Sequence, residues 1–93
     1  MRPLQQAMPG ALVDILHDTP LSPGKIGFAW RAAVGPAVDK MTSVHLENGV
    51  LIVEAATKAW TREVKRSAPI VLVRLQTLLG ADTVRTITVR DHA

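Results

Sequence analysis

The sequence predicts a single α+β domain in which helices pack on one face of a three-stranded sheet. The pair Asn48-Gly49 separates two apolar segments and favours the two-residue turn of a β-hairpin, because both residues accept positive φ. Apolar residues recur at helical spacing on both sides of this hairpin, and the last segment alternates apolar and polar residues as strands do. Because helices and sheets must bury their apolar sides against each other, two layers are expected.

Before the hairpin, the sequence predicts two helices and a strand. Apolar residues at helical spacing indicate a first helix over about residues 4–17, within an N-terminal helix and loop of residues 1–20. Pro9-Gly10 interrupts this helix, so its main part is expected over residues 10–17. Ser22-Pro23 indicates the start of a second helix, because serine caps helix N-termini and proline suits the first helical position. Gly35-Pro36 is expected to end that helix. Residues 37–46 are then predicted to form the first strand.

After the hairpin, Val50 to Ala55 is an almost continuous apolar run, which favours a central, well-covered strand. Thr57 is expected to cap a helix that starts at Lys58. Pro69 lies inside this helix, where proline costs about 3 kcal/mol because it removes a backbone donor and clashes with the preceding turn. The segment Ser67-Ala68-Pro69 is therefore predicted to divide it into two helices.

The second of these helices is predicted to end at Gly80, and Val84 to Arg90 is the predicted last strand. The expected order is α-α-β-β-α-α-β. Residues 21–90 are expected to form the core of a single domain that spans residues 1–93.

Composition excludes several classes of protein. The chain has 93 residues, 47% hydrophobic and 20% charged, which indicates one globular domain. It has no cysteine, so disulfides and cysteine-based metal sites are excluded. No segment has the roughly 18 consecutive apolar residues of a membrane span, and the first residues lack the apolar run of a signal peptide. A cytoplasmic protein without membrane association is expected.

The positive charge is concentrated in the C-terminal half. Residues 1–55 contain four Lys and Arg and five Asp and Glu, whereas residues 56–90 contain seven and two. Such one-sided charge indicates an anionic partner, of which nucleic acid is the commonest. A surface that merely improves solubility is the alternative.

Four cations of the helix that starts at Lys58 are predicted to share one face, opposite Trp60 and Val64. They are Lys58, Arg62, Lys65 and Arg66. Arg74 is expected to extend this positive surface. Together these side chains can neutralise several phosphates, which would give sequence-independent and salt-sensitive binding. The alternative is an ordinary solvated helix face.

The two tryptophans lie on apolar stripes, so Trp30 and Trp60 are predicted to pack in the core rather than to stack on unpaired bases. The segment from Gly24 to Gly27 matches the Gly-x-x-Gly pattern with which KH domains clamp nucleic acid. A KH loop would lie between paired helices, at residues 67–69, so this glycine pair is interpreted as part of a helix start.

Catalysis is not expected. His17, His45 and His92 share no metal-ligand spacing, and the chain has no glycine-rich phosphate loop followed by lysine and a hydroxyl residue. We therefore predict no enzyme activity, no metal, no cofactor and no small-molecule substrate.

From Trp30 to about Arg90 the chain resembles the DciA family of bacterial replicative-helicase loaders. The resemblance depends on two tryptophans, a hairpin and three glycines in a fixed order. The residues concerned are Trp30, Val34-Gly35, Thr42, the Leu46 to Val53 hairpin with Gly49, Ala59-Trp60, and Leu75 to Gly80.

This resemblance implies a KH-like fold, with Trp30, Gly35, Gly49, Trp60 and Gly80 as structural core residues. It implies that the chain binds the replicative helicase and helps to place this ring on single-stranded DNA. Two alternatives share the charge pattern: a KH-like RNA-binding module, and a domain that binds only other proteins.

Overall fold

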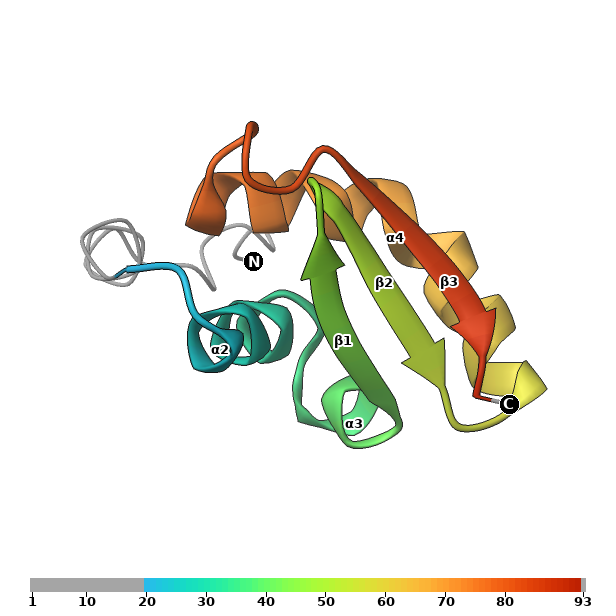
Figure 1. Ribbon diagram of the computed structural model, residues 1–93. Helices are drawn as coiled ribbons and strands as arrows, with labels where there is room; N and C mark the ends of the chain where they lie inside the picture. Colours follow the sequence, from blue (N-terminus) through green and yellow to red (C-terminus); the bar gives the residue numbers. More distant parts are fainter. Residues whose placement is uncertain (1–19, 93) are drawn as a thin grey trace, which may run out of the picture.

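The computed structural model describes residues 20–92, which form three helices and a three-stranded sheet. Figure 1 shows how these elements are arranged. The elements in chain order are α2 (Pro23–Val34), α3 (Pro36–Lys40), β1 (Thr42–Glu47), β2 (Val50–Ala55), α4 (Lys58–Leu79) and β3 (Thr86–Asp91). The predicted α+β class is confirmed. The helix predicted over residues 4–17 lies outside the described residues.

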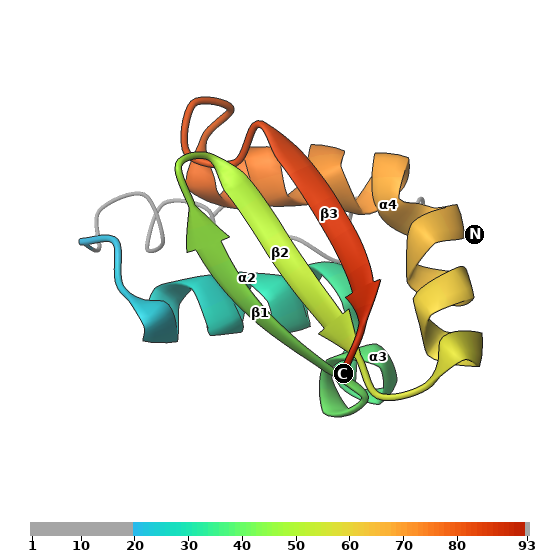
Figure 2. The same cartoon turned by 45° about the vertical axis from the view of Figure 1, so that its right-hand side comes forward.

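The sheet has the order β1-β2-β3, with β2 antiparallel to β1 and parallel to β3. The predicted central position of β2 is confirmed. Parallel neighbours need a long crossover connection, and α4 supplies it between β2 and β3. Figures 1 and 2 show α2 and α4 on the same face of the sheet. Leu51, Val53 and Ala55 are fully buried beneath these helices.

The turn between β1 and β2 has the predicted geometry. Glu47 pairs with Val50, so the turn contains two residues, and both have positive φ: 49° at Asn48 and 82° at Gly49. The Gly49 carbonyl also accepts a hydrogen bond of 2.8 Å from the Arg85 backbone N–H. This turn therefore holds the start of the last strand as well as the hairpin.

We expect Gly49→Ala to destabilise the domain by about 1–2 kcal/mol, because the left-handed region disfavours any residue with a Cβ atom. An added Cβ would also lie 2.6 Å from Nε of Arg85, so that this flexible side chain would have to move. Such a loss lowers Tm by roughly 4–8 °C per kcal/mol in a domain of this size. Thermal unfolding followed by circular dichroism measures it.

Gly27→Ala is the matched control. Gly27 lies inside α2, and an added Cβ meets no atom within 4 Å. Alanine is more favourable than glycine in a helix by about 0.5–1 kcal/mol, so Tm should stay the same or rise. If both variants lowered Tm equally, the special role of the hairpin turn would be contradicted.

The second helix begins and ends where predicted. The Ser22 hydroxyl accepts a 3.1 Å hydrogen bond from the Lys25 backbone N–H, and Gly35 follows the last helical residue with φ of 88°. The predicted strand over residues 37–46 is wrong in its first half, which forms α3. Proline is favourable at the first position of a helix, so Pro36 ends α2 and begins the next helix.

The predicted break at Ser67-Ala68-Pro69 is also wrong, because α4 is one helix from Lys58 to Leu79. Val64 and Leu75, on either side of Pro69, are both buried in the core. Each such side chain contributes about 1.5–3 kcal/mol on burial, which together offsets the proline penalty. Figure 2 shows that the helix bends near its middle, as helices usually do at a proline.

The core lies between the sheet and the two long helices, and Trp30 is its largest side chain, with 1% exposed. The indole N–H of Trp30 donates a 2.8 Å hydrogen bond to the Thr42 hydroxyl, which donates in turn to the Val38 carbonyl at 2.8 Å. A buried indole N–H needs such a partner. These bonds connect α2, α3 and β1 at one end of the sheet.

Candidate nucleic-acid interface

The first half of α4 presents four cations to solvent. Thr57 caps the helix by accepting a 3.1 Å hydrogen bond from the Trp60 backbone N–H. From there, Thr61 and Val64 turn inward and are buried. The side chains on the outer side are exposed, and we call them the cationic face: Lys58, Arg62, Lys65 and Arg66. The predicted grouping of these cations on one face agrees with the structure.

The cations of this face have few acidic neighbours. Arg66 pairs with Glu63 at 3.2 Å, and both side chains are largely exposed. Exposed pairs contribute only about 0–1 kcal/mol and are screened by salt, so Arg66 stays accessible to an anion. Within residues 20–92, Lys58, Arg62 and Lys65 have no ion-pair partner. The cationic face is therefore a surface of largely uncompensated positive charge.

The remaining arginines of the basic half make contacts within the domain. Arg74 donates from Nη1 to the Ala33 carbonyl at 2.9 Å, near the C-terminus of α2. Arg85 donates to the Asn48 carbonyl at 2.7 Å, and Arg90 pairs with Glu54 at 3.1 Å. Arg74 does not extend the positive surface as the sequence predicts, because its half-buried guanidinium lies between α2 and α4. Sequence spacing gives no sign of this contact, since its partner is 41 residues away.

Trp60 lies outside the buried core, unlike Trp30. It is partly exposed and lines a cleft of about 250 Å³ between α4 and the end of α2, together with Glu63 and Arg74. The sequence-based placement of both indoles in the core therefore holds for Trp30 only. Trp60 is at the margin of the apolar stripe, close to the start of α4, where fewer neighbours cover it. Gly80, another expected core residue, ends α4 with φ of 100°.

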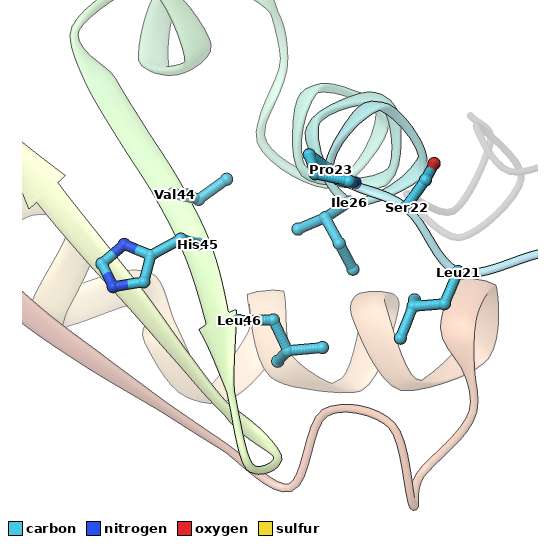
Figure 3. Close-up of a pocket in the computed structure, with 7 residues that line it drawn as sticks. All are labelled: Leu21, Ser22, Pro23, Ile26, Val44, His45 and Leu46. Carbon is cyan, nitrogen blue, oxygen red and sulfur yellow. The ribbon is translucent and has the colours of Figure 1, made fainter.

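A second hollow, of about 300 Å³, lies between the start of α2 and β1. Figure 3 shows Leu21, Ile26 and Leu46 directed toward this space, whereas the ring of His45 points to the other side of the strand. The lining is mainly aliphatic, so the hollow offers no charge to a phosphate. The residues come from segments about 20 positions apart, and sequence spacing did not reveal it.

Comparison with protein families decides which family these features represent. The family model described as Dna[CI] antecedent, DciA, matches residues 3–89. The chain belongs to the DciA family. The match covers nearly the whole chain and extends further toward the N-terminus than the resemblance seen from Trp30 onward. Comparison with curated proteins and with solved structures finds no match.

Membership of the DciA family implies a helicase-loader-like role in bacterial DNA replication. The cationic face is consistent with a role at nucleic acid. In the described part of the chain, no helix is both long enough and apolar enough to cross a membrane.

Proposed function

We propose that this DciA-family protein is a non-enzymatic accessory of DNA replication that binds the replicative helicase and single-stranded DNA and assists helicase loading. The cationic face is the observation that supports DNA binding. Its four cations lie within nine residues of α4, from Lys58 to Arg66, which are about 12 Å apart along the helix axis at 1.5 Å per residue. Such a row of charges neutralises backbone phosphates without reading bases, which suits a protein that acts wherever a helicase is loaded.

The arrangement β1-β2-α4-β3 supports the proposal of a KH-like domain with one difference. KH domains clamp the nucleic-acid backbone with a Gly-x-x-Gly loop. In this chain, α4 is continuous where that loop is expected, and Gly24 and Gly27 lie in α2 instead. The proposed grip on DNA therefore uses long cationic side chains rather than close approach of the backbone, so it should depend strongly on salt.

The test is binding of the purified chain to the purified replicative helicase of the same bacterium, with and without a single-stranded oligonucleotide. We expect the chain and the helicase to elute together in size-exclusion chromatography. We also expect the chain alone to raise the fluorescence anisotropy of a labelled DNA oligonucleotide at low salt.

Two results would favour other functions. Binding to matched RNA much more tightly than to DNA, without helicase binding, would indicate an RNA-binding module. Helicase binding without any affinity for nucleic acid would indicate a protein-interaction domain. Failure to bind either ligand would contradict the proposed function.

A further inference from the structure

The second half of α4 is apolar on two opposite sides. Its inner side, with Val71 and Leu75, is buried in the core. Its outer side has three exposed residues, which we call the outer apolar stripe: Pro69, Ile70 and Val73. At 3.6 residues per turn these three lie within about 100° of arc, facing away from the core. Ile70 is 60% exposed and Val73 is 62% exposed, more than any other large apolar residue in the described part of the chain.

Neither the helix nor its packing explains this stripe. Isoleucine and valine are weaker helix formers than lysine, arginine or glutamine, and a proline inside a helix is strongly unfavourable. On an exposed helix face, these residues give up helix stability without burying apolar surface in return. Residues that lower the stability of their own helix without adding to the packing of the fold are expected at functional sites. Ile70 and Val73 are three positions apart, which is one of the spacings of the anchors by which helices dock into apolar grooves.

The charged residues next to the outer apolar stripe indicate what kind of surface would bind it. Arg66 precedes Ile70 by one helical turn, and Arg62 precedes Arg66 by another, so the stripe continues directly into the cationic face. Three side chains make a patch far smaller than the about 800 Å² per partner of a specific interface, so residues around the stripe must also be covered, with Arg66 at the border with the DNA-binding cations. The complementary surface is an amphipathic helix with apolar side chains flanked by acidic ones.

A second copy of this chain fits less well. A symmetric dimer uses the same patch on both copies, so two cationic faces would flank one small apolar contact. Bringing like charges to one interface is unfavourable.

We infer that the outer apolar stripe is the surface that docks on the helicase, beside the DNA-binding cationic face on the same helix. This inference rests on the proposed function. One bent helix would then bind both ligands side by side, with DNA on its first half and the helicase on its second half. Helicase binding should then depend on apolar contact and respond less to salt than DNA binding does.

The test replaces the stripe without changing charge. Glutamine is neutral and a better helix former than isoleucine or valine, so Ile70→Gln with Val73→Gln should leave the thermal melt unchanged or raise it. We expect this double variant to bind the helicase at least tenfold more weakly in biolayer interferometry. Its affinity for a single-stranded DNA oligonucleotide should change less than twofold. Phe28→Gln is the matched control, because Phe28 is 55% exposed on α2, outside the stripe.

Other outcomes would overturn the inference. Unchanged helicase affinity of the double variant, with the wild type binding, would remove the stripe from the interface and leave the proposed function standing. A wild-type dimer that the double variant converts to monomer would assign the stripe to a second copy. A wild type that fails to bind the helicase would contradict the proposed function itself.

Discussion

Reversing three charges of the cationic face, by Lys58→Glu, Arg62→Glu and Lys65→Glu, is expected to weaken single-stranded DNA binding at least about a hundredfold. These three cations have no ion-pair partner within the described residues, so each can meet a phosphate. Glutamate at the same positions repels the backbone instead of neutralising it. Fluorescence anisotropy with a labelled oligonucleotide at low salt measures the change.

The dependence on salt gives a second readout of the same variant. For single strands, log K falls with log salt by about 0.7 for each phosphate contact. A wild-type slope of about −2 to −3 would correspond to three or four contacts, as the cationic face allows. The triple variant should retain little binding and a slope close to zero. A steep slope that survives the reversal would show that the phosphates lie elsewhere on the molecule.

Loss of binding through unfolding can be excluded by the melt. Lys58 is the first residue of α4, where a positive charge opposes the helix dipole and a glutamate favours it by about 0.3–1 kcal/mol. The triple variant should therefore melt no lower than the wild type. Lys40→Glu is the control for net charge, because Lys40 is exposed in α3 and does not belong to the cationic face. It should weaken DNA binding far less than Lys58→Glu alone.

The elements with strong local signals could be predicted from the sequence. Asn48-Gly49 determines its turn because few other residues accept positive φ, and Ser22 and Gly35 determine the ends of α2 by the same kind of local chemistry. The four cations of the cationic face likewise share one side of α4 because of their spacing along a helix of 3.6 residues per turn. These features depend on residues a few positions apart, so no knowledge of the tertiary structure is needed.

The features that sequence reasoning missed depend on distant residues. Pro69 stays inside α4 because core packing on either side of it outweighs its local penalty. Arg74 is held by the Ala33 carbonyl, and Trp60 stays partly exposed because α4 begins at the margin of the core. The sequence does not mark the outer apolar stripe, because apolar residues on all sides of a helix do not show which side is buried.

The two tryptophans offer the sharpest test of the fold. We expect Trp30→Ala to cost about 3–5 kcal/mol, because it removes a fully buried indole and leaves a large cavity. A domain is typically stable by about 5–15 kcal/mol, so most or all of the stability would be lost. Trp30→Phe should cost less, because the ring remains and the Thr42 hydroxyl still donates to the Val38 carbonyl. Urea unfolding followed by circular dichroism gives these free energies.

Trp60→Ala is the matched comparison for the same chemical change. The Trp60 indole is partly exposed to solvent at its cleft, so its removal opens no closed cavity and should cost less than half as much as Trp30→Ala. Equal losses at the two positions would mean that Trp60 belongs to the core after all. In that case the first turns of α4 would pack more deeply against α2. The cations of the cationic face would then point in a different direction, because the rotation of the helix about its axis fixes the direction of Trp60 and of the cations together.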